Sequence, residues 1–188
     1  MSLSSSNPTD EELMTAFARS GDNLLFEQIV ARHMDRALHA AQMLLGNRAA
    51  AEDAVQECFL RVIRARTSYQ KDQSFSSWFF TILRNLCRDE RARRATASRH
   101  SSSAERDPAP DAAVHAEARE EYLDAQRALQ ELPAEDREIL ILRIHAGWCF
   151  EEIAAKFDLS TDAAKKRAYR ALAQVRQRLK TAETKGKI

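Results

Sequence analysis

The sequence contains little glycine and proline, with four residues of each among 188. Collagen-like and low-complexity chains need far more of both, and a hydrophobic content of 44% is too high for wholesale disorder. No apolar run approaches the ~18 residues that a membrane span requires, and the first ten residues are too polar for a signal peptide. We therefore expect a cytoplasmic globular protein, with either one domain or two small ones.

Cysteine is also scarce, and none of the three residues belongs to a C-x-x-C pair. Cys58, Cys87 and Cys149 lie among apolar neighbours, which predicts reduced thiols in the core. The sequence has no glycine-rich phosphate loop or nucleophile elbow, and its five histidines lack a fitting catalytic partner. His145 and Cys149 have metal-like spacing, but Gly147 interrupts the helix between them. We expect neither an enzyme nor a bound cofactor or metal.

Alternating β-branched patterns are absent as well, whereas Ala, Leu, Glu, Arg and Gln dominate, so the expected fold class is all-α. Apolar residues recur at helical spacing, and capping residues and glycines mark the expected helix starts and ends. The predicted helices cover about residues 10–21, 23–46, 49–66, 75–94, 117–132, 133–145, 150–157 and 161–180. A Ser-, Ala- and Pro-rich stretch divides them. The expected organisation is a helical domain at 10–94, a flexible linker at 95–116, a second helical domain at 117–181 and a tail at 182–188.

The net charge of +1 conceals strong blocks of one sign. Lys and Arg exceed Asp and Glu by seven over residues 61–104 and again over 160–188, whereas residues 105–139 carry a net −7. Two separate basic blocks are typical of two contacts with a polyanion, because phosphate binding depends on local Lys and Arg density. Solvated helix faces remain the alternative for the basic blocks, and a solvated linker for the acidic one.

The last third has the pattern of a helix-turn-helix, with a short helix at 150–157, a tight turn and a long helix from Thr161. Ser160 or Thr161 can cap the second helix. Its first three turns carry four basic residues and Tyr169, where a recognition helix meets the major groove. We therefore favour DNA contact over an ordinary basic amphipathic helix.

The same residues carry a family resemblance. Residues 147–171, with Leu132-Pro133 and Arg137 before them, resemble the region-four helix-turn-helix of bacterial extracytoplasmic-function (group 4) RNA polymerase sigma factors. Residues 51–60 resemble that family's region-two motif, and Phe75 to Arg91 resembles the helix that opens promoter DNA. The sequence departs from the family at Asp158, where a glycine is usual, and at Asp162-Ala163-Ala164. An aspartate tolerates left-handed backbone better than most residues.

The resemblance implies a role for each segment. Asp53, Gln56 and Leu60 would bind the clamp helices of the largest polymerase subunit, and Asp53 and Gln56 are three apart on one helix face. The implied contacts with the minus-ten element are Tyr69, Gln70, Lys71, Asp72, Ser74, Phe75, Arg84, Arg88 and Arg91. The implied contacts with the minus-thirty-five element are Ser160, Thr161, Lys165, Lys166, Arg167, Tyr169 and Arg170. Trp78 falls in the apolar stripe of its helix, which favours a core position over base stacking.

The expected function is therefore that of a sigma factor, which binds core RNA polymerase and promoter DNA and is regulated by a cognate anti-sigma factor. Two alternatives stay open. One is a helix-turn-helix repressor or activator that acts on duplex DNA without polymerase. The other is a protein-interaction module whose basic helices bind an acidic partner.

Overall fold

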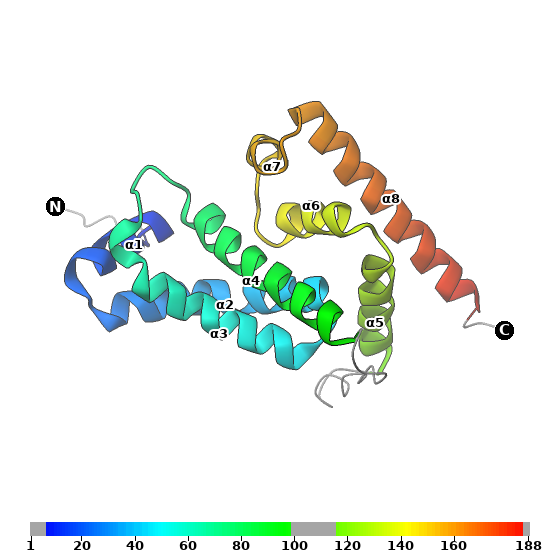
Figure 1. Ribbon diagram of the computed structural model, residues 1–188, viewed down its shortest axis with the longest axis horizontal. Helices are drawn as coiled ribbons and strands as arrows, with labels where there is room; N and C mark the ends of the chain where they lie inside the picture. Colours follow the sequence, from blue (N-terminus) through cyan, green and yellow to red (C-terminus); the bar gives the residue numbers. More distant parts are fainter. Residues whose placement is uncertain (1–6, 99–115, 186–188) are drawn as a thin grey trace.

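The computed structural model describes residues 7–98 and 116–185, and the regular structure in these ranges is entirely helical (Figure 1). This confirms the predicted all-α class. The helices are α1 Asp10–Ser20, α2 Asn23–Leu45, α3 Arg48–Arg64, η1 Arg66–Ser68, α4 Phe75–Ser98, α5 Ala116–Gln130, α6 Ala134–Ile144, α7 Phe150–Phe157 and α8 Thr161–Lys185. α4 continues four residues into the predicted linker, the rest of which lies outside the described residues apart from Ala116. No helix in the described ranges is long and apolar enough to cross a membrane.

Local capping sets the helix ends, as the sequence predicted. The Thr9 hydroxyl accepts from the Glu12 amide while the Glu12 carboxylate accepts from the Thr9 amide, which closes a capping box at the start of α1. Gly21 and Gly46 end α1 and α2 in left-handed conformation, with φ of 69° and 68°. Glycine reaches this conformation without a steric penalty, so both ends follow from local chemistry.

α1 to α4 pack around an aromatic core in which Phe75 and Phe79 of α4 contact the His33 ring of α2. Cys58 and Cys87 are buried in this half and free, as predicted. The Cys58 thiol donates to the Phe79 carbonyl at 3.7 Å. Burial raises the pKa of both thiols, that of Cys87 to about 12, so both stay protonated at neutral pH.

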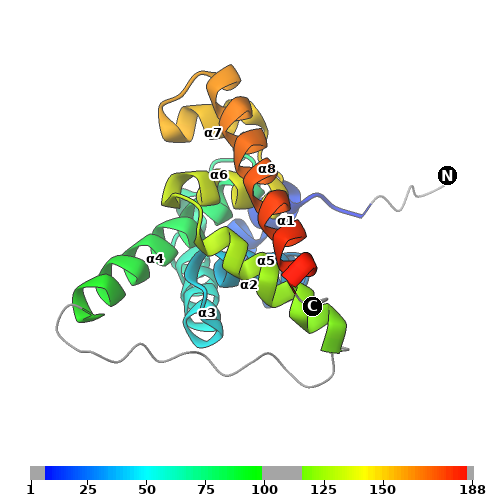
Figure 2. The ribbon, with the colours of Figure 1, turned by 90° about the vertical axis from the view of Figure 1, so that its right-hand side faces the viewer.

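α5 to α8 form a second group of helices. Figure 2 shows α8 running past α6 toward α5, and α8 contacts α5, α6 and α7. Small buried residues on α8, Ala164, Ala168 and Ala171, allow its close approach to the other helices. This group thus presents the first turns of α8 at one end, beside α7 (Figure 1).

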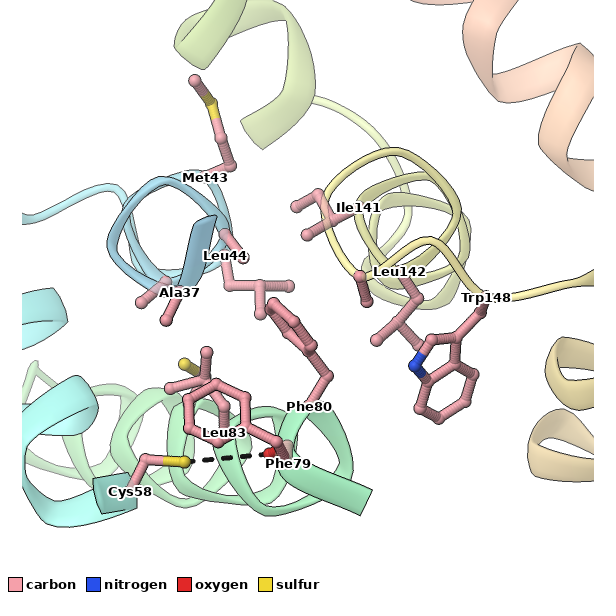
Figure 3. Packing of buried hydrophobic residues seen from close by; sticks show 14 of the residues in the cluster. Ala37, Met43, Leu44, Cys58, Phe79, Phe80, Leu83, Ile141, Leu142 and Trp148 are labelled. Carbon is pink, nitrogen blue, oxygen red and sulfur yellow. Dashed lines mark hydrogen bonds between the residues drawn. The ribbon is translucent and has the colours of Figure 1, made fainter. Parts of the chain in front are cut away.

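The two groups pack directly on one another, an arrangement that the sequence did not predict. Leu44 of α2 and Phe80 of α4 lie against Ile141 and Leu142 of α6 (Figure 3), and all four side chains are buried. Hydrogen bonds cross the same contact. The Arg36 guanidinium donates to the His145 carbonyl at 2.8 Å, the Ser76 hydroxyl donates to the Ala146 carbonyl at 2.7 Å, and Ser77 donates to Glu152. The α6–α7 segment therefore covers the face of α4 that points away from α3.

Candidate nucleic-acid interface

The turn between α7 and α8 has helix-turn-helix geometry. α7 ends at Asp158, which adopts the left-handed conformation with φ of 54°. The expectation that Asp158 tolerates left-handed backbone where a glycine is usual is confirmed. The Ser160 hydroxyl accepts from the Ala163 amide at 3.2 Å, so Ser160 caps α8 in preference to Thr161. Ile153 and Ala154 of α7 are buried.

The expectation that Cys149 lies in the core is wrong, because its side chain is exposed. It is the N-cap of α7: its sulfur accepts from the Glu152 amide at 3.4 Å, and the Glu152 carboxylate accepts from the Cys149 amide at 2.7 Å. An apolar neighbourhood in sequence predicted burial here, but the residue serves as a cap at the helix surface.

The basic residues of α8 divide into two groups. Lys165, Lys166 and Arg170 are exposed, as are Ser160, Thr161 and Tyr169, the last with 57% exposure. Arg167 is different, because its guanidinium donates to Asp136 at 2.7 Å and to Glu135 at 3.0 Å on α6. Burial works to lower the pKa of Arg167, but the two carboxylates outweigh it and raise the pKa. Arg167 therefore connects α8 to α6.

The basic ridge of α4, formed by Arg84, Arg88 and Arg91, is only partly open to solvent. Arg88 is exposed and Arg91 half-buried, but the expectation that Arg84 faces outward is wrong in this conformation. The Arg84 guanidinium forms an ion pair with Glu138 of α6 at 2.6 Å and lies 4.8 Å from the centre of the Phe157 ring. Arg91 is 4.0 Å from the same carboxylate. The second helical group thus covers one end of the ridge.

The acidic segment at 105–139 is therefore not simply a solvated linker. Its described end places Glu135, Asp136 and Glu138 on α6, where they contact arginines that the sequence assigned to DNA. The tertiary structure uses part of this acidic stretch against basic residues of α4 and α8.

The loop before α4 keeps its polar side chains in solvent. Gln70, Lys71, Asp72 and Ser74 are exposed. Behind them, the ring of Tyr69 lies 5.2 Å from that of Trp78 and 6.1 Å from that of Phe75. Phe75 is fully buried, whereas Trp78 is half-buried, so Phe75 is a core residue and Trp78 is core on one side only.

A groove of about 440 Å³ between α3 and α4 contains the open side of Trp78. Its lining includes Arg61, Arg64, Ile82 and Asn85. The sequence-based site did not include the two arginines. Their spacing of three within the basic block placed them on one face of a helix, a signal that could have marked them.

The proposed polymerase-binding residues share one exposed face of α3. Asp53, Gln56 and Leu60 are all exposed, and Leu60 is 46% exposed although it is apolar. Spacings of three and four residues put them in a single row on the helix. An exposed row of one carboxylate, one amide and one leucine can contact a partner helix.

His33 has a partner that the sequence did not reveal. Its Nε2 donates to the Asp10 carboxylate at 2.7 Å, and Arg32 donates to the same carboxylate at 2.8 Å. Burial lowers the pKa of His33 by more than Asp10 raises it, so the imidazole is neutral at pH 7. Burial works to raise the pKa of Asp10, but the hydrogen bonds and charges of Arg32 and His33 together outweigh it and lower the pKa. No group of three or more metal-ligating side chains occurs within residues 7–98 and 116–185.

Comparison with known proteins matches both halves of the chain to family models. Residues 29–97 match Sigma-70 region 2, and residues 122–175 match Sigma-70, region 4. The chain is 37% identical over 165 residues to RNA polymerase sigma factor CarQ of Myxococcus xanthus, covering 86% of this chain and 92% of that protein. It is 33% identical over 184 residues to ECF RNA polymerase sigma factor SigE of Mycolicibacterium smegmatis, covering 92% and 70% respectively.

Two solved structures resemble the fold at 26% sequence identity. One is CnrH in complex with the cytosolic domain of CnrY, with a TM-score of 0.68 and coverage of 92% of this chain and 99% of that one. The other is the sigma factor RpoE in complex with the anti-sigma factor NepR from Bartonella quintana, with a TM-score of 0.66 and coverage of 82% and 96%.

Proposed function

The chain belongs to the extracytoplasmic-function sigma factors of RNA polymerase, which direct promoter-specific transcription initiation, and we propose that its two helical groups divide the promoter between them. In this proposal α7 and α8 read the minus-thirty-five element. α2 to α4 bind core polymerase and open the minus-ten element. The polymerase supplies the chemistry, so this chain is not an enzyme, and it acts in the cytoplasm.

The observation that carries the proposal is the exposed basic cluster at the start of α8. Lys165, Lys166 and Arg170 lie in the first three turns of the second helix of a helix-turn-helix, with Tyr169 beside them. Positive charge near the N-terminal end of a helix opposes the helix dipole, so intrinsic helix stability does not account for it. Phosphate and base edges in the major groove do account for it.

The chemistry around the loop before α4 fits an unstacked single strand. The exposed side chains of Gln70, Lys71 and Asp72 can donate to and accept from base edges. The groove beside Trp78 combines an aromatic face with Arg61 and Arg64, which suits a base and the adjoining phosphates. Strand opening then follows from differential affinity, because flipped bases gain contacts that duplex DNA cannot make.

Binding of the minus-ten element through Arg84 requires the two helical groups to separate. Arg84 is buried against Glu138 in the packed arrangement, so α6 must leave α4 before this guanidinium reaches a phosphate. Core polymerase would provide the energy by binding the row of Asp53, Gln56 and Leu60. A cognate anti-sigma factor, as NepR is for the related RpoE, would oppose that step.

The test is transcription in vitro with purified core polymerase. Genomic fragments bound by the reconstituted holoenzyme would be selected and used as templates. We expect start-site-specific transcripts that depend on this protein, together with permanganate-reactive thymines near the start site. The matched control is the variant Lys165→Ala/Lys166→Ala, which should retain polymerase binding and lose promoter binding. Duplex binding without polymerase and without transcripts would replace this proposal with a repressor or activator.

A further inference from the structure

A carboxylate of α1 contacts the start of α4 from a distance of 64 residues in the chain. Glu11 Oε1 accepts a hydrogen bond from the Phe75 backbone amide at 2.9 Å. Phe75 is the first residue of α4, and an amide in the first turn of a helix has no partner within the helix. A negative charge there also complements the positive end of the helix dipole. Glu11 therefore satisfies the first amide of α4 and connects the start of this helix to α1.

Short-range hydrogen bonds order the rest of the loop before α4 and its junction with the helix. The Ser74 hydroxyl accepts from the Ser77 amide at 3.3 Å, which caps α4 locally. The Gln73 amide donates to the Gln70 carbonyl at 3.0 Å, and the Tyr69 hydroxyl donates to the Gln73 carbonyl at 2.6 Å. The two ends of the loop are thus tied to each other, and Glu11 connects the end of the loop to another helix through a charged group.

Glu11 lies close to both ends of the loop. Burial, and then the negative charges of Glu11 and Asp10, raise the pKa of Tyr69 to about 12. The phenol therefore remains a donor to Gln73 at neutral pH, and the carboxylate favours this protonated form. One acidic side chain thus accepts from the first amide of α4 and also lies near Tyr69 at the other end of the loop.

We propose that Glu11 is a positioning residue for minus-ten recognition: it holds the loop of Gln70, Lys71 and Asp72 in the orientation that reads an unstacked base. The inference rests on the proposed function of this loop. α1 precedes residue 29, where the match to Sigma-70 region 2 begins, so it adds a determinant from outside the matched segment. Without the carboxylate, the first amide of α4 turns to water and the loop gains alternative orientations.

The neighbouring acidic residues of α1 do not share this contact. Asp10 pairs with Arg32 and His33 of α2, and Glu12 closes the capping box with Thr9. Glu12→Gln therefore removes the same charge from the same helix turn, and it keeps an oxygen that can complete the box. It is the matched control for Glu11→Gln.

The experiment measures promoter selectivity of the full chain with core polymerase. Pairs of templates differ at one base of the minus-ten element, and the readout is the ratio of their transcripts. We expect Glu11→Ala to reduce that ratio roughly fivefold, in line with loss of one charge-assisted hydrogen bond. Glu11→Gln should show a smaller loss, because its amide oxygen still accepts from Phe75. Glu12→Gln should leave the ratio unchanged, as should both Glu11 variants for templates that differ in the minus-thirty-five element.

Three outcomes decide the matter. If Glu11 has only a structural role, its variants lower transcription from both templates equally and leave the ratio constant, and this result overturns the inference. If Glu11→Ala does not fold, the same ratio is measured with Glu11→Gln. Gln70→Ala and Lys71→Ala test the loop itself. If they change the ratio and the Glu11 variants do not, the inference fails and the proposed function stands. If the loop variants leave the ratio constant, the proposed function of the loop fails, and the inference with it.

Discussion

Arg84 of α4 and Glu138 of α6 form an ion pair at 2.6 Å, with side chains only 9% and 5% exposed, and this pair joins the two helical groups. Arg84 lies one helical turn beyond Phe80 on α4, and Glu138 lies one turn before Leu142 on α6. A buried pair gains little over an apolar pair of the same shape, but either partner alone is strongly unfavourable. The packed arrangement therefore depends on both charges.

Glu138→Gln is expected to separate the two helical groups. It leaves the Arg84 charge buried without its partner, a cost of about 3–5 kcal/mol that opening of the contact relieves. Small-angle X-ray scattering should show a larger radius of gyration than for the parent protein. Glu131→Gln is the control, because its ion pair with Arg178 at 2.7 Å lies within the second group and its carboxylate is exposed.

The double variant Arg84→Met/Glu138→Leu should return to the compact form, since it removes both buried charges at once. An unchanged radius of gyration for Glu138→Gln would contradict the role that we assign to the pair.

Lys165→Ala and Lys166→Ala should each weaken binding to minus-thirty-five duplex DNA and reduce the slope of log affinity against log salt by about 1, because each removes one phosphate contact. Fluorescence anisotropy of a labelled duplex at several salt concentrations measures both. Arg176→Ala, exposed on α8 but beyond its first turns, is the control and should keep the parent slope.

Arg167→Ala should behave differently from the two lysine variants. It leaves Asp136, a buried carboxylate, without its arginine. We expect the free energy of unfolding to fall by about 1–3 kcal/mol, measured by urea denaturation. A loss of DNA affinity with full stability would instead place Arg167 in the DNA interface.

Asp53→Ala and Gln56→Ala should each weaken binding to core polymerase by about tenfold if this row forms the centre of the contact. Affinity for minus-thirty-five duplex DNA should stay at the parent value, because α3 lies in the other helical group. Polymerase pull-down and anisotropy with the full chain separate the two effects. Glu27→Ala, exposed on α2, is the control; equal losses in both assays would refute the separation.

Stability should fall as the pH drops below about 6.5, because the pKa of buried His33 is lowered in the folded state. The unfolded chain then binds a proton that the folded protein rejects, so the free energy of unfolding declines with acid. The lowered pKa of His145 acts in the same direction, whereas the lowered pKa of Asp10 matters only below about 3.8. Urea midpoints at pH 7.5 and 5.5 measure this. His33→Gln should reduce the difference by more than the exposed His39→Gln, which acts only through the pKa of His145.

Local chemistry made much of the fold predictable. Thr9, Gly21 and Gly46 mark helix ends through capping and left-handed backbone, which depend on a few neighbouring residues. The same holds for Asp158 in the turn before α8. The predicted exposure of Asp53 and Gln56, and of Lys165 and Lys166, followed from helical periodicity and is confirmed.

Apart from Cys149, whose exposure follows from a local capping box, the errors concern residues whose environment comes from distant parts of the chain. Periodicity placed Arg84 outside the apolar stripe of α4, but it has no information about α6, which covers that side. Arg167 looked equivalent to Lys165 and Lys166 until Asp136 of α6 was found beside it. Glu11 carried no local signal at all, because its partner is the Phe75 amide on another helix.

The sequence by itself determined the helices, their caps, the helix-turn-helix and the family, because these depend on short-range spacing and on motifs in order. Only the tertiary structure decided which basic side chains are free to meet DNA, since ion pairs between α4, α6 and α8 join residues that are 31 to 54 positions apart. It also decided that the two helical groups pack on each other through α2, α4 and α6, where apolar surfaces from both halves exclude water.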